Sequence, residues 1–128
     1  MTVKEIMTFT SGFACILSTL FAELTEVLRP QEQNIEFIVA ALIGCIQGGH
    51  AVFVTGSGIS GAIAKMLVFR LKQLGVEAYH IPEGVARSYR PGDVLFAISS
   101  SGTTKTTLTQ VKQAKRVEGV MIISIVSE

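Results

Sequence analysis

Glycine and hydroxyl residues gather in two segments of the chain, and each segment directly follows a short apolar run. The first is Gly56–Gly61, which reads G-S-G-I-S-G, and the second is Ser99–Thr104, which reads S-S-S-G-T-T. Glycine lets the backbone approach a ligand closely, while hydroxyls and backbone N–H groups donate hydrogen bonds. A helix that begins at such a segment adds partial positive charge. The two segments therefore predict a site for a phosphorylated ligand held between them.

The predicted roles divide by residue type. Hydroxyl groups are expected to hold the phosphate, and glycines are expected to let the backbone come close to it. The candidate phosphate-binding residues are Ser60, Ser99, Ser100, Ser101 and Thr104, with Gly56, Gly58 and Gly102 beside them. Three basic residues, Lys65, Arg87 and Lys105, either offset phosphate charge or are simply solvated.

Both segments also have interpretations that need no phosphate. The first matches the letters G-x-G-x-x-G of a dinucleotide site, but such a site needs an acid at the end of the second strand. Here that strand ends in His80-Ile81-Pro82, with Glu77 before it and Glu83 beyond it, which disfavours a dinucleotide-binding module. Glycines can also serve tight strand–helix packing alone. A helix cap explains one or two hydroxyls of the second segment, not five.

The elements that must position these segments alternate in type. Short apolar runs are separated by helical patterns, and Gly48, Gly75 and the Pro91-Gly92-Asp93 turn mark boundaries. We expect strands at 51–55, 76–81, 94–98 and 120–126 and helices at 59–74 and 104–117. Strands that alternate with helices predict an α/β fold with a parallel sheet covered on both faces. The ligand would then sit beyond the carboxyl ends of the first and third strands.

The N-terminal third reads as two helices rather than as part of the sheet. Residues 3–28 carry apolar side chains on two faces, and a second helix runs to about Gln47. We expect residues 1–48 to form a helical oligomerisation segment of a homodimer or homotetramer, and 50–128 to form the α/β core. The uncharged run Ile6–Ala22 is diluted by hydroxyl residues and has no basic region before it, so we expect no membrane segment.

Composition excludes several classes of function. The chain has 128 residues, which suits a single domain, and a net charge of +1, which gives no electrostatic footprint for nucleic acid. Cys15 and Cys45 lie in apolar helical patterns and are expected to be buried free thiols, which fits a reducing, cytoplasmic setting. No C-x-x-C or H-x-x-x-H spacing is present, so we expect no metal site.

Together the motifs resemble the sugar isomerase (SIS) family of phosphosugar-binding domains. That family carries G-x-G-x-S after its first strand and S-x-S-G-E-T after its third. The matching residues here are Gly56, Gly58 and Ser60, and then Ser99, Ser101, Gly102 and Thr104. Within the family, the closest resemblance is to the 6-phospho-3-hexuloisomerases. It is carried by Gly58-Ile59-Ser60-Gly61, Ala64-Lys65, Arg70-Leu71, Leu74-Gly75, Glu83, and Gly92-Asp93 leading into Ala97-Ile98-Ser99.

The resemblance implies a three-layer sandwich with a flavodoxin-like sheet, and a cofactor-free isomerase of sugar phosphates. The reaction would interconvert 3-hexulose 6-phosphate and fructose 6-phosphate through an enediolate. Glu83 is the candidate general base and His80 a candidate proton carrier, although each is also of a type found as an exposed acid or a packed histidine. Thr103 replaces the family's glutamate, and the chain ends before the family's last strand and helices. A phosphosugar-binding or sensing domain without catalysis is therefore the alternative.

Overall fold

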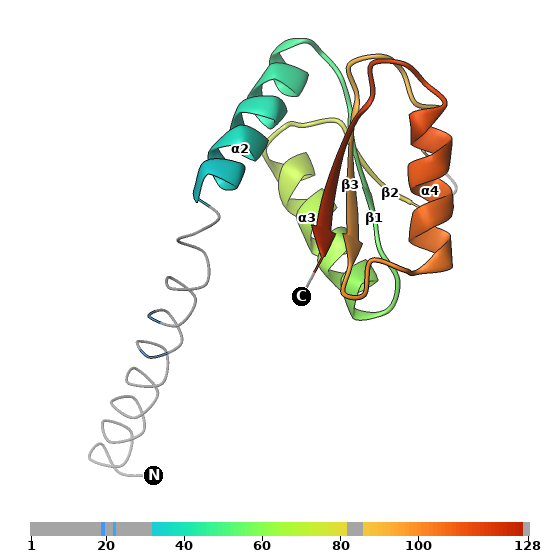
Figure 1. The fold of residues 1–128 in the computed structure, drawn as a ribbon. Helices are drawn as coiled ribbons and strands as arrows, with labels where there is room; N and C mark the ends of the chain where they lie inside the picture. Colours follow the sequence, from blue (N-terminus) through green and yellow to red (C-terminus); the bar gives the residue numbers. More distant parts are fainter. Residues whose placement is uncertain (1–18, 20–21, 23–31, 82–85, 127–128) are drawn as a thin grey trace, which may run out of the picture. The chain divides into compact units, whose positions relative to one another are not determined.

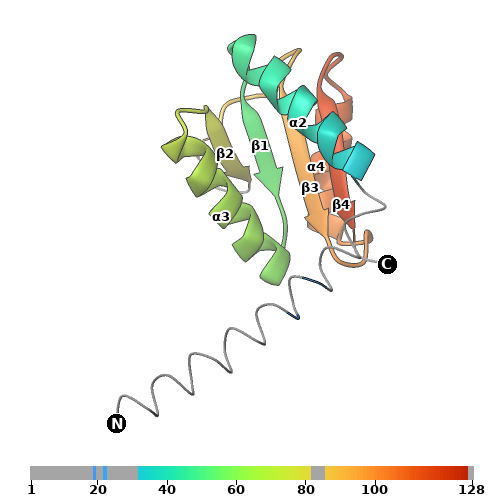
Figure 2. The ribbon, with the colours of Figure 1, turned by 90° about the vertical axis from the view of Figure 1, so that its left-hand side faces the viewer.

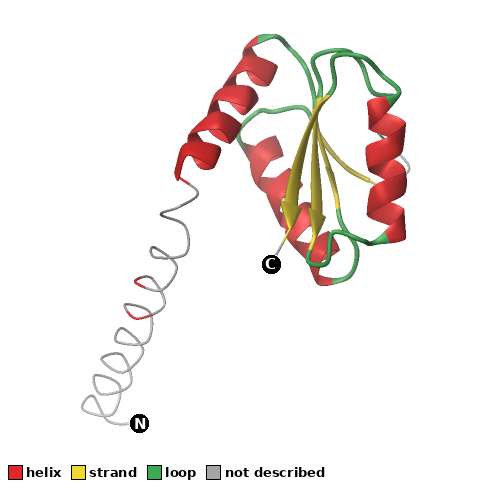
Figure 3. Cartoon of the chain, in the orientation of Figure 1, coloured by secondary structure: helices red, strands yellow, loops and turns green. Residues whose placement is uncertain are grey.

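The computed structural model describes residues 19, 22, 32–81 and 86–126. The chain divides into two compact units, residues 1–37 and 38–128, and the second contains the sheet. Most of the helix predicted for residues 3–28 lies outside the described residues. The described elements, coloured by type in Figure 3, are α2 (Glu32–Gln47), β1 (Val52–Thr55), α3 (Ile59–Gln73), β2 (Ala78–Ile81), β3 (Val94–Ser99), α4 (Lys105–Lys115) and β4 (Met121–Val126).

The four strands form one parallel sheet in the order β2-β1-β3-β4. The register is regular, so that Val54 of β1 lies opposite His80 of β2 and Phe96 of β3. The chain leaves β1 first to one side and then to the other, which is the strand order of flavodoxin-like sheets. The predicted α/β class, the parallel sheet and the four strands are confirmed.

Helices cover both faces of the sheet, as Figures 1 and 2 show: α2 and α3 lie on one face and α4 on the other. Successive side chains of a strand point to opposite faces, so each face has its own apolar cluster. On the first, Val52 and Val54 pack with Val68 and Leu71 of α3. On the second, Phe53 packs in a cluster that includes Ala114 of α4. Both faces are covered, which explains why the central strands read as continuous apolar runs.

All four strands run in the same direction, so the sheet has two chemically different ends. We call the end at Ala51, Glu77 and Asp93, where β1, β2 and β3 begin, the amino edge. The carboxyl edge is the end where β1 and β3 finish, at Thr55 and Ser99. Both glycine- and hydroxyl-rich segments follow directly from the carboxyl edge. The topology therefore brings the two segments to the same end of the molecule, as predicted.

Candidate functional site

The first loop, which joins β1 to α3, owes its tight shape to two glycines. A side chain on Gly56 would come within 2.6 Å of the Ser60 carbonyl oxygen, so only glycine allows the helix to begin this close to the strand. Gly58 has a φ of 61° and is the residue before the helix, a conformation that costs other residues free energy. Ser60 is half-buried in the first turn of α3. The loop thus presents backbone and two hydroxyls, those of Ser57 and Ser60, at the carboxyl edge.

The second loop, which joins β3 to α4, is organised by hydrogen bonds among its own residues. The buried Ser99 Oγ accepts the Gly102 N–H at 3.0 Å and lies 2.9 Å from Thr104 Oγ1. Ser101 Oγ accepts both the Thr103 N–H at 3.2 Å and the Thr103 hydroxyl at 2.9 Å. A hydroxyl has one proton and two lone pairs, so Ser101 and the Ser99–Thr104 pair each retain one proton to donate. The loop therefore offers donors to a ligand and carries no negative charge.

A direct hydrogen bond joins the two loops. Ser57 Oγ in the first loop lies 2.7 Å from Thr106 Oγ1 in the first turn of α4. Their residues are far apart in sequence but meet because β1 and β3 are neighbours in the sheet. The two loops therefore lie side by side, as predicted, and a side-chain hydrogen bond joins them.

The N-termini of α3 and α4 are left without side-chain caps. Neither Gly58 nor Thr104, the residues before the two helices, makes a capping side-chain hydrogen bond, and neither helix has an acid in its first turn. The Thr104 hydroxyl pairs with Ser99 instead, so the interpretation of this segment as an ordinary helix cap is not supported. Because neither first turn carries an acid, no side chain of these turns opposes the partial positive charge at the carboxyl edge.

The predicted hydroxyl residues therefore lie at one edge of the sheet. Of the two predicted catalytic residues, His80 is among the described residues and Glu83 is not. Ser100 and Ser101 are exposed in the second loop. Glu83 lies outside the described residues. His80 is 6% exposed and sits in β2 level with Val54, on the face that α3 covers. It therefore lies within the packed layer between sheet and helix, short of the loops.

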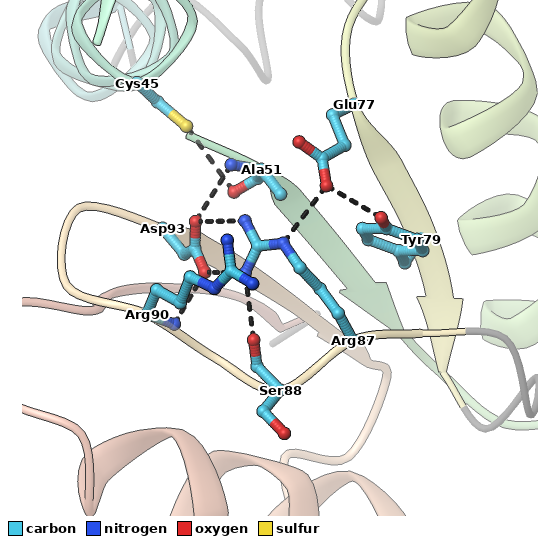
Figure 4. A network of polar contacts seen from close by, with 8 residues as sticks. All are labelled: Cys45, Ala51, Glu77, Tyr79, Arg87, Ser88, Arg90 and Asp93. Carbon is cyan, nitrogen blue, oxygen red and sulfur yellow. Dashed lines mark hydrogen bonds and ion pairs between the residues drawn. The ribbon is translucent and has the colours of Figure 1, made fainter. Parts of the chain in front are cut away.

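The predicted basic residues fall at different places. Lys65 and Lys105 are exposed on α3 and α4. Arg87 lies at the amino edge, where its guanidinium bonds both carboxylate oxygens of Asp93, at 2.8 and 3.0 Å, and Glu77 at 3.1 Å (Figure 4). Neither alternative given for Arg87, offsetting phosphate charge or being simply solvated, describes it, because two carboxylates hold it at the opposite end of the sheet.

The amino-edge network is centred on the fully buried Asp93. Its Oδ1 also accepts the Ala51 N–H at 2.9 Å, and its Oδ2 accepts the Arg90 N–H at 2.7 Å. Burial alone would raise the pKa of Asp93, but hydrogen bonds from Arg87 and from these backbone groups lower it overall. The bond to Asp93 in turn raises the pKa of Arg87. These contacts hold residues 87–93 against the starts of β1 and β2.

Reasoning from the sequence missed three polar residues with defined roles in these contacts. Ser57 and Thr106 join the loops, and Asp93 anchors the amino edge, although the sequence suggested only a turn there. The available signal for Asp93 was an acid immediately before a strand with no other polar residue until Ser99. No local pattern could have paired Ser57 with Thr106, because their contact depends on strand order.

A parallel sheet in this strand order, with helices on both faces, belongs to the doubly wound class of α/β folds. The SIS domain family matches residues 46–128, and the chain belongs to that family. A 3-hexulose-6-phosphate isomerase of Methanocaldococcus jannaschii is 39% identical over 88 residues, covering 69% of this chain and 48% of that protein. The chain spans about half the length of the curated relatives it matches.

Solved structures show the same fold. A Methanococcus jannaschii protein with an inferred function of 3-hexulose-6-phosphate isomerase matches with a TM-score of 0.62 and 30% identity, covering 73% of this chain and 51% of that one. A phosphoheptose isomerase from Neisseria gonorrhoeae has a TM-score of 0.61 at 17% identity, covering 87% of this chain and 74% of its own, and shares the fold. The predicted SIS resemblance is confirmed.

Among the residues that the structure describes, no group of three or more His, Cys, Asp or Glu side chains is placed to hold a metal ion. Within the same ranges, no helix has both the length and the apolar character needed to cross a membrane.

Proposed function

We propose that this chain contributes the phosphosugar-binding core of an isomerase that interconverts 3-hexulose 6-phosphate and fructose 6-phosphate. The observation that carries the proposal is the carboxyl edge, where two uncapped helix N-termini and a network of donor hydroxyls come together. Relatives named 3-hexulose-6-phosphate isomerase support the choice of substrate. In this proposal Ser60, Ser99, Ser101 and Thr104 hold the phosphate.

The proposed chemistry moves a carbonyl group by one carbon. A base removes the proton from the carbon next to the carbonyl, an enediolate forms, and the proton returns to the former carbonyl carbon. This sequence is redox-neutral within the sugar and needs no cofactor. Glu83 is the proposed base, because it follows β2 closely and the carboxyl end of β2 faces the same edge as the loops. His80 stays the second candidate for proton transfer.

Ligand binding and turnover test the two parts of this proposal separately. Fructose 6-phosphate should raise the melting temperature, whereas fructose should not, because the donors at the carboxyl edge recognise the phosphate. Equal shifts with both sugars, or none with either, would contradict the assigned ligand class. Replacement of Glu83 by Gln should lower turnover at least about a hundredfold with little loss of affinity. Glu77→Gln, an acid at the amino edge, is the matched control and should leave turnover unchanged.

A non-catalytic phosphosugar-binding or sensing domain is the second candidate. It is favoured by Thr103, which stands where the family motif has glutamate and which contributes no carboxylate beside the sugar. Saturable binding of fructose 6-phosphate without any isomerisation would select this alternative.

We also propose that copies of the chain assemble as a homodimer or homotetramer. The outward sides of α2 and α3 carry large apolar side chains that are 45–84% exposed, namely Val39, Ile43, Ile46, Ile59, Ile63, Met66 and Phe69. Residues 37–64 contain no Asp, Glu, Lys or Arg. An exposed apolar face of this kind marks an interaction surface. The predicted interface at residues 1–48 would thereby extend onto α3.

Sedimentation velocity tests this assembly. Met66→Glu places a charge within the apolar face and should shift the protein towards the monomer. Gln113→Glu adds the same charge on the exposed side of α4 and should leave the assembly unchanged. A parent protein that sediments as a monomer at micromolar concentration would contradict the proposal.

The proposed partner is a sugar phosphate, and the proposed setting is the cytoplasm. A net charge of +1 offers nucleic acid little attraction. Cys45 is a buried free thiol whose pKa is raised mainly by burial, so it remains protonated and unreactive in a reducing compartment.

A further inference from the structure

The hydroxyl of Thr103 does not sit at a helix cap or in the core but bonds the neighbouring Ser101. Thr103 is exposed, and it approaches Ser101 Oγ twice, through its N–H at 3.2 Å and through its hydroxyl at 2.9 Å. Both contacts have Thr103 as the donor. Ser101 is one of the residues proposed to hold the phosphate, so the arrangement bears directly on that site.

The number of lone pairs on a hydroxyl oxygen determines what Ser101 can still do. A serine oxygen accepts at most two hydrogen bonds and donates one. Because Thr103 occupies both acceptor positions, only the Ser101 proton remains for a further partner. Ser101 can therefore donate a hydrogen bond to a ligand but cannot accept one.

The nearby Ser99–Thr104 pair lacks this restriction. Ser99 Oγ accepts the Gly102 N–H, but either member of the pair can donate to the other across 2.9 Å. Its free proton can consequently sit on either residue. Compared with the Ser99–Thr104 pair, Ser101 is a hydroxyl whose donor direction is set by a neighbour, and Thr103 is the residue that sets it.

We propose that Thr103 is a positioning residue that turns Ser101 into a one-way donor, so that the second loop selects a phosphoryl oxygen over a neutral hydroxyl. A phosphoryl oxygen only accepts hydrogen bonds, which suits a group that only donates, and bonds to charged acceptors are the stronger kind. A sugar hydroxyl can still accept the Ser101 proton, but its own proton finds no acceptor on Ser101. An ionised carboxylate at position 103, as in the family motif, has no side-chain proton to donate to Ser101. The inference rests on the proposed phosphosugar site and assigns a specific residue to its selectivity.

The test is a double-mutant cycle on fructose 6-phosphate affinity, measured by calorimetry with the full chain. Thr103→Val keeps the shape but removes the hydroxyl, and should weaken binding about three- to tenfold. Thr103→Ser retains the hydroxyl and should bind within about twofold of the parent. Ser101→Ala removes the donor itself and should weaken binding further. In the Ser101→Ala background, Thr103→Val should have no additional effect, because Thr103 acts only through Ser101.

The outcomes test the positioning role of Thr103 and the proposed phosphosugar site separately. Additive losses in the double variant, or a Thr103→Ser variant as weak as Thr103→Val, would overturn the role of Thr103 while leaving the phosphosugar site intact. A parent chain that binds neither fructose 6-phosphate nor inorganic phosphate would overturn the proposed function, and this inference with it. Thr103 is exposed, so the melting temperatures without ligand should agree among the variants. Thr103→Ala serves as a second hydroxyl deletion and should weaken binding to a similar degree.

Discussion

The two edges of the sheet both concentrate polar residues, but they satisfy them in opposite ways. At the amino edge, Asp93 accepts four hydrogen bonds, two from Arg87 and two from backbone N–H groups. At the carboxyl edge, hydroxyls pair with one another and retain protons, and two helices begin without side-chain caps. The Asp93 carboxylate at the amino edge is thus fully hydrogen-bonded within the protein, whereas hydroxyls at the carboxyl edge keep protons that a ligand can accept.

We therefore expect the polar residues of the two edges to differ in role, with those of the amino edge stabilising the fold and those of the carboxyl edge binding a ligand. A buried charge is tolerated only when its partners are all present, so the amino edge should contribute to stability and be sensitive to any missing partner. Hydrogen-bond donors near the surface that have no protein partner cost little free energy, because water solvates them. The same donors can stabilise a bound anion. Variants at the amino edge should therefore change unfolding, and variants at the carboxyl edge should change binding.

The largest expected effect comes from Asp93→Ala. The substitution leaves the Arg87 guanidinium and the Ala51 N–H without their buried acceptor, and should lower the free energy of unfolding by about 3–5 kcal/mol. Urea denaturation monitored by circular dichroism measures the change. A loss below about 1 kcal/mol would show that the network is replaceable, and the contrast between the edges would fail.

The next effect is expected from Ser101→Ala at the carboxyl edge. Loss of a hydrogen bond to a charged group should weaken fructose 6-phosphate binding by about 1.5–3 kcal/mol. The free energy of unfolding should barely change, because Ser101 is exposed. Ser88→Ala is a matched control, since Ser88 is also exposed and only its carbonyl oxygen is bonded, to Arg87. If Ser101→Ala destabilises the fold and spares binding, the assignment of the edges is reversed.

Low pH should reduce the contribution of Asp93 at the amino edge to the free energy of unfolding. The pKa of Asp93 is lower in the folded protein than in the unfolded chain, so its contribution is complete above the unfolded value near 4. That contribution is lost as the pH falls through the lower, folded pKa. Urea unfolding between about pH 6 and pH 3 should show a steeper loss for the parent than for Asp93→Asn. Equal slopes would mean that Asp93 is not the group that titrates.

The smallest effect is expected from Glu77→Gln. Glu77 lies at the rim of the same network with its side chain 45% exposed, and hydrogen bonds from Tyr79 and then Arg87 lower its pKa. Exposed ion pairs contribute little, so unfolding should change by less than about 1 kcal/mol. A loss comparable with that of Asp93→Ala would show that Glu77, and not the buried carboxylate, anchors Arg87.

The elements themselves could be predicted from short-range patterns. Continuous apolar runs such as Val52–Val54 and Val94–Ile98 predicted buried strands, and the helix at 59–73 was expected within one residue. The hydroxyl-rich segment after β3 predicted a binding loop, because five hydroxyls exceed what a helix cap needs. The predictions of strands and helices succeed because strand burial, helix periodicity and glycine turns depend on neighbours in sequence, whereas the binding role of the loop stays a prediction.

Tertiary structure decided which distant residues meet. Only the strand order β2-β1-β3-β4 puts Ser57 beside Thr106. The structure also places Arg87 against Asp93 at the amino edge rather than at the carboxyl edge. It also shows that the Thr103 hydroxyl points to Ser101, which the sequence recorded only as a departure from a motif. The contact between Ser57 and Thr106 depends on a distance of a few ångströms between segments that are remote in the chain, so no local pattern encodes it. The bond from Thr103 to Ser101 is local, but it depends on the exact backbone conformation of the loop, which the residue types alone do not specify.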